Sequence, residues 1–447
     1  MANIEPVSLT MHDTKYRRKP VTLSSATLLV IANMIGTGVF TTLGLQLISV
    51  HSIPAVLLLW IVGGMSAFCG ALAYGELGAI MPRSGGEYHY LSNIYHPAAG
   101  FLSGCASMVA GFGAPIALAA IALGHYMHSV FPGINETAAG VSVIAALTMV
   151  HLVDVRFGCQ FQNVFTASNI LLIATFITAG FFTPHPQQVV LWEGNEVETI
   201  FSPAFAVALV YVSYAYSGWN ASAYVAGEVQ KPERNLPVSL FVGTLFVSIC
   251  YVLLNFIFLY TVPVRQLTGR IDVAYLSAKA VFGLSGARIV TLLICLALVA
   301  TLSSMIMAGP RVTQVMGEDI GVLRLFAKKN RRGSPVYAIL LQSSVALLLT
   351  VTSTFNAILT YVGFTLTLFA FLTVLGVFVL RVKKPGIERP FKMWGYPVTP
   401  AFYLVLNGSM LCYLLIQRPF PSAVGLLTVG SALLLYSLLA RPAKITS

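Results

Sequence analysis

The stretch NMIGTGVF, residues 33–40, lies in the middle of the first long apolar segment of the chain. A transmembrane helix should be unbroken at this depth, yet a glycine in a helix interior costs roughly 1 kcal/mol relative to alanine. Gly36 and Gly38 are two positions apart, so they point to different sides and cannot form one packing face. Unwound backbone at membrane depth is tolerated only where it is buried in protein or lines a cavity. The stretch therefore predicts a helix break at a binding site.

The composition is that of a protein that crosses a membrane many times. Hydrophobic residues make up 57% of the chain and charged residues only 9%, whereas soluble domains are about a quarter charged. Apolar runs long enough to span a bilayer recur along nearly the whole length. We count about twelve, the third being long for one span, at residues 23–48, 54–80, 97–130, 138–155, 161–183, 203–226, 237–262, 285–309, 335–354, 356–381, 398–416 and 420–440. The predicted fold class is an all-α polytopic membrane protein with 12 transmembrane helices.

The basic residues indicate orientation rather than nucleic-acid binding. The chain has 26 Lys and Arg against 15 Asp and Glu. Cytoplasmic loops of membrane proteins carry an excess of Lys and Arg, and the tail at residues 1–20 contains four of them after residue 14. We therefore expect a multi-pass protein of the inner or plasma membrane with both termini in the cytoplasm. Membrane lipid is an expected partner and nucleic acid is not.

The six cysteines give no sign of a disulfide framework. All of them, including Cys69, Cys105, Cys250 and Cys412, fall within or at the ends of predicted spans. None sits in a predicted outside loop, where an oxidising environment would allow a disulfide to form. The sequence therefore predicts no disulfide-linked partner chain.

A second interruption, YAYSGWN at residues 214–220, lies deep within the sixth apolar run. Broken helices at corresponding positions in two halves of a chain are typical of secondary transporters built from inverted repeats. We expect a 5+5 arrangement with broken helices 1 and 6. The first repeat would cover residues 21–183 and the second residues 203–382, and residues 398–441 would add two peripheral helices.

The two breaks together suit a zwitterion. Breaking a helix frees N–H groups at the start of its second half and C=O groups at the end of its first half. The freed N–H end carries partial positive charge and favours a carboxylate, while the freed carbonyls favour an ammonium group or a sodium ion. An α-amino acid is the commonest small metabolite with both groups.

At these positions the chain resembles a known family. IGTGVF at residues 35–40 is similar to the Gly-Ser-Gly signature of the amino acid/polyamine/organocation (APC) superfamily. The chain also resembles the L-type amino acid transporter branch of this superfamily. The motifs that carry this resemblance are YSGWN at 216–220, GEVQKPERNLP at 227–237, YGEL at 74–77 and PRSGGEY at 82–88. The resemblance covers essentially the whole chain. It implies the LeuT-type fold and amino acid transport by alternating access.

The resemblance also implies a substrate site. The substrate carboxylate would bind the N–H groups of Thr37 and Gly38, and the α-amino group would bind carbonyls at Met34, Tyr214 and Ser217. Tyr214 or Trp219 would act as a lid, with plain packing as the alternative. The full set of expected substrate residues is Met34, Ile35, Gly36, Thr37, Gly38, Tyr214, Ser217, Gly218 and Trp219.

The coupling mechanism is left open by the sequence. Many relatives carry a lysine in span five in place of a sodium ion, and this chain has Asn169 at that position. By resemblance, sodium would be held by the carbonyls of Ala32, Ile35 and Ala300 and the hydroxyls of Ser303 and Ser304. The alternative is that both serines bond to carbonyls of their own helix. Sodium is the candidate coupling ion at this site, and no cofactor is expected.

Charged side chains are expected only near the cytoplasmic ends of spans. Glu76, Arg83, Glu87 and Glu228 sit there, and we interpret all four as salt-bridge residues that shape an inner gate, with Glu76, Arg83 and Glu228 as the gate candidates and a solvated surface role as the alternative. Glu76 is also an alternative proton carrier. His151 lies at a span end and is expected to be interfacial.

The predicted function is secondary active transport of a small or medium neutral L-amino acid by alternating access, with sodium as one candidate coupling ion. A neutral substrate is favoured because the pocket-forming spans offer no acid or base. The alternatives are a sodium-independent amino acid exchanger and a proton-coupled amino acid/polyamine permease. A membrane enzyme would need a nucleophile–base pair or a metal cluster, and a channel would need filter segments or rings of charge. The sequence shows neither the enzyme features nor the channel features, so we expect a transporter rather than an enzyme or a channel.

Overall fold

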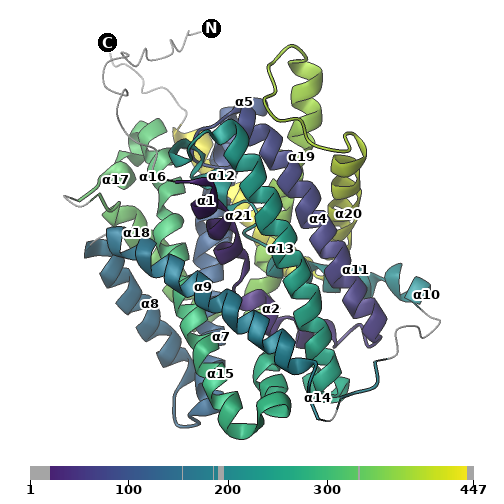
Figure 1. The fold of residues 1–447 in the computed structure, drawn as a ribbon. Helices are drawn as coiled ribbons and strands as arrows, with labels where there is room; N and C mark the ends of the chain where they lie inside the picture. Colours follow the sequence, from purple (N-terminus) through teal and green to yellow (C-terminus); the bar gives the residue numbers. More distant parts are fainter. Residues whose placement is uncertain (1–20, 154, 185, 190–195, 331–332, 440–447) are drawn as a thin grey trace, which may run out of the picture.

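The computed structural model describes residues 21–153, 155–184, 186–189, 196–330 and 333–439. Within this described part the secondary structure is helical, apart from one isolated bridge between Val21 and Val229. Among the described residues, nine helices are long and apolar enough to cross a membrane, and three shorter apolar helices of 10–17 residues bring the number to twelve. The all-α polytopic fold with twelve spans is confirmed (Figure 1).

The first five spans run from α1 to α9. Their helices are α1 (Leu23–Met34), α2 (Thr37–Thr41) and α3 (Leu43–Gln46) in span one, α4 (Ile53–Ile80) in span two, α6 (Pro97–Ala106), the π-helix η1 (Ser107–Gly113) and α7 (Ala114–Val130) in span three, α8 (Glu136–Val153) in span four and α9 (Val155–Gly180) in span five. The short helix α5 (Glu87–Ile94) joins spans two and three.

The remaining spans run from α11 to α21. They are α11 (Pro203–Ala215) with α12 (Ala221–Tyr224), α13 (Pro232–Thr261), α15 (Val273–Ala308) continued by α16 (Pro310–Asp319), α18 (Val336–Thr352), α19 (Phe355–Lys383), α20 (Val398–Gln417) and α21 (Pro419–Leu439). Short connecting elements are α10 (Glu196–Ile200), η2 (Ala226–Glu228), α14 (Val264–Leu267), η3 (Gly321–Leu323) and α17 (Arg324–Ala327). Span eight begins earlier than predicted because α15 continues through a kink at Gly283, which has a φ of 68°.

Capping side chains set the starts of several spans. Thr22, Ser52, Ser202 and Thr354 each accept a hydrogen bond from the backbone N–H three residues further on. Such N-caps satisfy one of the donors that a helix start leaves unpaired. The residue types at these boundaries are therefore the local reason why the helices begin where they do.

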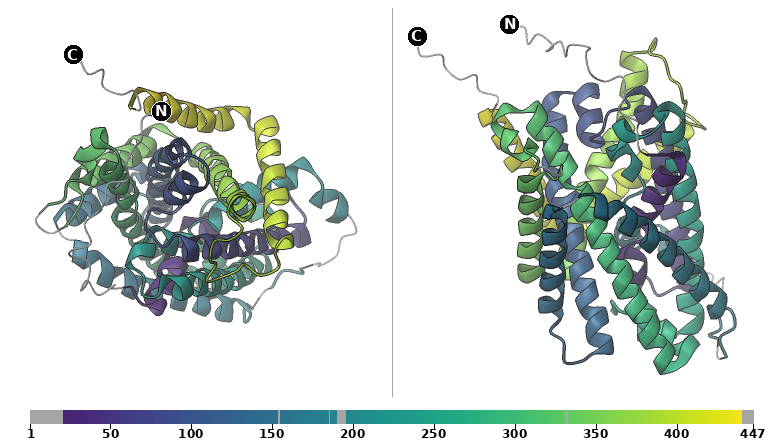
Figure 2. Two further views of the ribbon diagram at one scale, coloured as in Figure 1. Left: turned by 90° about the horizontal axis from the view of Figure 1, so that it is seen from above. Right: turned by 60° about the vertical axis from the view of Figure 1, so that its left-hand side comes forward.

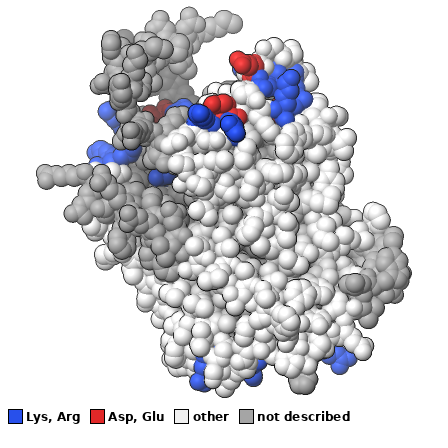
Figure 3. All heavy atoms as spheres, in the orientation of Figure 1, with Lys and Arg blue, Asp and Glu red and all other residues white. Residues whose placement is uncertain are grey.

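The outer surface is that of a membrane protein. Figure 3 shows charged side chains gathered at the two ends of the visible face, with a broad uncharged band between them. Large apolar side chains point outward from the helices, for example Leu171 at 67%, Val405 at 73% and Leu427 at 69% exposure. Apolar exposure on this scale is costly in water and normal against lipid tails. The chain is thus a multi-pass integral membrane protein.

The helices surround a buried core that contains the broken spans. In Figure 1, α4 and α13 run along each other, with α1 beside α13. Seen from above in Figure 2, the yellow helices α20 and α21 lie along the outer edge of the bundle. The last two spans are peripheral, as the LeuT-type fold class predicts.

Both predicted helix breaks are present. In span one, α1 ends at Met34 and α2 begins at Thr37, with Gly36 in an extended conformation between them. In span six, α11 ends at Ala215 and α12 begins at Ala221. Gly218 has a φ of +94°, a conformation that side chains with a Cβ rarely adopt. The glycines therefore interrupt helices that hydropathy alone would make continuous.

Candidate functional site

The two helix breaks contact each other directly. A Cβ built on Gly218 would lie 2.6 Å from the carbonyl oxygen of Asn33. A Cβ built on Gly38 would lie 2.3 Å from the Cα of Ala215, where α11 ends. Only glycine permits backbone approach this close. The glycines of the two breaks thus bring the freed ends of four half-helices to one place.

Side chains cover most of the break in span one. The hydroxyl groups of Thr37 and Tyr214 are 2.8 Å apart, and both residues are buried. The Tyr251 hydroxyl donates a hydrogen bond to the carbonyl of Met34. Met34 and Ile35 are each only 1% exposed. In this conformation the break in span one is therefore buried, with the Thr37 hydroxyl and the Met34 carbonyl each in contact with a tyrosine hydroxyl of the protein itself.

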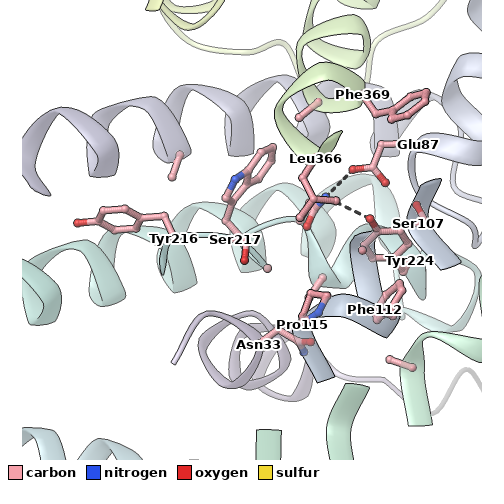
Figure 4. A pocket seen from close by; sticks show the side chains of 18 of the residues that line it. Asn33, Glu87, Ser107, Phe112, Pro115, Tyr216, Ser217, Tyr224, Leu366 and Phe369 are labelled. Carbon is pink, nitrogen blue, oxygen red and sulfur yellow. Dashed lines mark hydrogen bonds between the residues drawn. The ribbon is translucent and has the colours of Figure 1, made fainter. Parts of the chain in front are cut away.

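The break in span six lines a cavity. Figure 4 shows Asn33, Tyr216, Ser217, Phe112 and Leu366 around it. The wall includes the break itself, α1 and α4, η1 and α7 of span three, α19 of span ten, the end of α15 and part of α20. Ser217, Gly218 and Trp219 belong to this wall, whereas Met34, Ile35, Gly36, Thr37, Gly38 and Tyr214 do not. The structure thus divides the predicted substrate residues into a covered set and a cavity set.

The π-helix η1 was not predicted from the sequence. It places Ser107, Gly111 and Phe112 on the cavity wall. A π-turn shifts the facing of a helix by inserting an extra residue, and such turns are common at functional sites. The long third apolar run carries no local signal for it beyond Gly111 and Gly113.

Glu87 corrects the sequence analysis, because it was expected in a salt bridge at a cytoplasmic span end but lines the cavity and forms no ion pair among the described residues. It is 6% exposed and lines the cavity beside Asn220 and Tyr224. Its Oε1 accepts hydrogen bonds from the Tyr74 hydroxyl at 2.8 Å and from Asn220 Nδ2 at 2.6 Å. Its Oε2 has no hydrogen-bond partner among the described residues. The signal in the sequence is PRSGGEY: Gly85 and Gly86 both have positive φ and turn the chain inward.

The predicted gate residue Glu76 forms a compact ionic cluster. It is 1% exposed, and Arg381 donates to both of its carboxylate oxygens at 3.0 and 2.6 Å. Arg389 lies 3.6 Å away, and the backbone N–H of Met393 donates at 2.8 Å. The cluster joins α4, α19 and the connection that leads to α20. Both oxygens of Glu76 are therefore used by fixed donors.

The other two predicted gate residues are also ion-paired. Arg83 contacts Asp319 at the end of α16 at 2.8 Å, and Glu228 in η2 lies 3.6 Å from Arg311 in α16. These pairs connect the ends of spans two and six to the end of span eight. Their role in gating stays a prediction.

The predicted sodium ligands do not all face the break. The Thr301 hydroxyl lies 3.5 Å from the Ile35 carbonyl. The Ser303 hydroxyl is instead 2.9 Å from Nε2 of His151 on α8. Ser304 Oγ is buried and has no partner among the described residues. The structure thus adds Thr301, which was missed, and directs Ser303 to another helix; sodium binding by Ala32, Ile35, Ala300, Ser303 and Ser304 stays a prediction.

His151 is a correction to the sequence analysis. It was expected at the membrane interface, but it is 2% exposed and packed against α15. The expectation failed because it used only the position of His151 near a span end and not the side of α8 on which it lies. Asn169, the coupling candidate on α9, is buried at 6% exposure.

The arrangement defines a class of protein. Paired broken helices that meet at a cavity within a membrane bundle are the binding architecture of secondary transporters. The family model for amino acid permeases matches residues 21–438, and the chain belongs to the amino acid permease family. The protein is therefore an amino acid transporter rather than an enzyme, and the APC resemblance is confirmed.

The curated relatives are transporters as well. The chain is 31% identical over 433 residues to "Large neutral amino acids transporter small subunit 2" of Mus musculus, covering 92% of this chain and 78% of the relative. The human protein of the same name is 30% identical with the same coverage. The human "b(0,+)-type amino acid transporter 1" is 26% identical over 418 residues, covering 90% of this chain and 84% of the relative.

The names of these relatives correct the prediction about partner chains. A small subunit is one member of an assembly, so the prediction that no disulfide-linked partner exists is contradicted. That prediction rested on the positions of cysteines alone, and the described cysteines Cys69, Cys105, Cys250, Cys295 and Cys412 are free in this chain. Cysteine positions alone give no information about the surfaces that a second subunit would cover.

Proposed function

We propose that this protein exchanges neutral α-amino acids across the membrane by alternating access, without sodium coupling. The observation that carries the proposal is the contact between the two helix breaks at Gly218 and Asn33, with a cavity beside it. Freed N–H and C=O groups at one place recognise the two charged groups of an amino acid. The names of the relatives make large neutral amino acids the first substrates to test.

The carboxylate of the substrate would bind at the start of α2. The first N–H groups of a helix have no intrahelical acceptor and carry partial positive charge. In this conformation the Thr37 hydroxyl forms a hydrogen bond of 2.8 Å with the Tyr214 hydroxyl. We expect a substrate carboxylate to take this place, so that Tyr214 moves when the substrate binds and acts as its lid.

The ammonium group would bind carbonyls at the ends of α1 and α11. The carbonyl of Met34 is already a hydrogen-bond acceptor for Tyr251, and carbonyls accept two hydrogen bonds. Tyr251 would therefore hold the freed carbonyl in position without blocking its second lone pair. Tyr214 and Ser217 would supply the facing carbonyls from span six.

The side chain of the substrate would enter the cavity. Its wall includes Trp219, Phe112, Leu366 and Pro115, which suit an apolar side chain. Access from the cytoplasm would be controlled by the Arg83–Asp319 and Glu228–Arg311 pairs, with the first repeat (21–183) rocking against the second (203–382). Both chain termini would lie in the cytoplasm under the positive-inside rule.

Exchange without sodium is supported by the contacts that the hydroxyl groups of span eight make. Ser303 is engaged by His151, and Thr301 already approaches the Ile35 carbonyl. The second candidate is sodium symport, which is favoured by the buried and unpartnered hydroxyl of Ser304.

Proteoliposomes test the proposal. We expect uptake of labelled leucine to require unlabelled amino acid inside and to be equal in sodium and choline buffers. Uptake into empty vesicles that depends on sodium would instead establish the symport candidate. Uptake into empty vesicles driven by a proton gradient would establish the permease alternative.

A further inference from the structure

Only one of the two carboxylate oxygens of the buried residue Glu87 accepts hydrogen bonds from the described residues. The Tyr74 hydroxyl and the Asn220 amide, both uncharged donors, bind the same oxygen, Oε1. Oε2 is buried and without a partner among the described residues. A buried carboxylate oxygen left in this state costs free energy unless something pairs with it. Since Glu87 lines the cavity, the missing partner has room to arrive from there.

The surroundings favour a cation with N–H donors. Figure 4 shows the Glu87 carboxyl group near Ser107 and Tyr224, on the cavity side next to Phe369. Among the described lining residues, Glu87 and Arg311 are the charged ones. Arg311 is already paired with Glu228 at 3.6 Å. The negative charge of Glu87 is therefore the one in this cavity without an opposite charge beside it.

The distance from the helix break suits the side chain of an amino acid. Asn220, which holds Oε1, lies two residues after Gly218 in the break. Two residues of extended chain span at most about 7 Å. A substrate whose backbone groups sit at the break would thus bring the end of a long side chain close to Glu87.

Resting on the function proposed above, we propose that Oε2 of Glu87 is a subsite for the positively charged end of a substrate side chain, so that the transporter accepts amino acids with a terminal ammonium group besides neutral ones. The ammonium group would donate a charge-assisted hydrogen bond to Oε2. Neutral substrates would leave that oxygen unpaired or facing water in the cavity.

Lysine and norleucine form a matched pair of probes, because norleucine has the same carbon chain without the terminal ammonium group. In proteoliposomes that exchange leucine, we expect both to inhibit. In Glu87→Gln the side-chain carbonyl still accepts from Tyr74 and Asn220. We expect inhibition by lysine to weaken by about ten- to a hundredfold, the effect of losing a hydrogen bond to a charged group, while inhibition by norleucine is unchanged.

The control variant is Glu233→Gln, which removes an exposed acid from the first turn of α13, outside the cavity. It should leave lysine and norleucine inhibition as in the wild type. If the Glu87→Gln protein is not recovered folded, wild-type inhibition by lysine and by uncharged 6-hydroxynorleucine replaces it. Stronger inhibition by lysine supports the subsite, and equal inhibition overturns it.

Three results with Glu87→Gln would overturn the proposal. They are an equal effect on lysine and norleucine, no effect on either, and loss of a pH dependence of leucine exchange with lysine inhibition intact, which would make Glu87 a proton site. Failure of lysine to inhibit the wild type would overturn it too, while the proposed leucine exchange would stand. Absence of leucine exchange in the wild type would refute the proposed function itself.

Discussion

Glu76 and Glu87 are two buried acids at the same end of the bundle, and their surroundings are opposite. Glu76 receives donors on both oxygens from Arg381 and the Met393 backbone, with Arg389 beside them. Glu87 receives two uncharged donors on one oxygen and none on the other among the described residues. The comparison teaches that burial of an acid does not identify a site. A carboxylate whose two oxygens both accept hydrogen bonds from the protein stabilises the contact between helices, whereas one with an unpaired oxygen facing a cavity can bind a ligand.

The largest expected effect on stability is that of replacing Glu76. Glu76→Gln leaves two arginines next to an uncharged amide, and removing one partner of a buried ion pair costs about 3–5 kcal/mol. We expect a large drop in the unfolding temperature in detergent. Glu87→Gln, measured in the same way, should unfold close to the wild type. Equal destabilisation of both variants would show that the two acids do not differ in the way described.

Gly218→Ala tests the helix break on the cavity side. The new Cβ would meet the Asn33 carbonyl at 2.6 Å in a left-handed conformation, a strain of about 1–3 kcal/mol. We expect leucine exchange to be lost, because the two breaks are forced apart. Gly133→Ala is the matched control, since nothing lies within 4 Å of its Cβ position. Normal exchange by Gly218→Ala would mean that the close approach is not needed.

Tyr74→Phe removes one of the two donors to Glu87. A single buried hydrogen bond contributes about 0.5–1.5 kcal/mol, so a small decrease in the unfolding temperature is expected. Lysine inhibition of leucine exchange should change more than norleucine inhibition, because the carboxylate loses one of the groups that orient it. An unchanged ratio between lysine and norleucine would argue against that orienting role.

The smallest effect on stability is expected for the exposed gate pair. Arg83 and Asp319 are 52% and 32% exposed, and an exposed pair contributes at most about 1 kcal/mol. Arg83→Gln should leave the unfolding temperature nearly unchanged. If the pair belongs to the inner gate, the leucine exchange rate should change and become less sensitive to salt. An unchanged rate would place the pair on the solvated surface instead.

The spans and both breaks could be predicted because their signals are local. Apolar length decides a span, and glycine at Gly36 and Gly218 decides a break. The proposed binding of the two charged groups of a substrate rests on backbone chemistry at those breaks. Nothing more than the residue types at consecutive positions was required.

The positions of side chains around the breaks could not be predicted in the same way. Thr301 and Ser303 are two residues apart, so they face different sides of α15, and an apolar helix gives no local sign of which side meets α1. Glu87 reached the cavity only because the Gly85–Gly86 turn folds α5 back against the bundle. The prediction of no disulfide-linked partner failed for a similar reason, because cysteine positions say nothing about a surface that another chain could cover, and the relatives include a transporter named as a small subunit.

The central claim is that the two facing breaks bind both charged groups of an amino acid. Competition with labelled leucine for the purified protein tests it most directly, using 3-methylbutan-1-amine, which lacks the carboxylate, and 4-methylpentanoic acid, which lacks the amino group. The account predicts that unlabelled leucine displaces the label and that neither analogue does so at the same concentration. Displacement by either analogue as effective as that by leucine would contradict it.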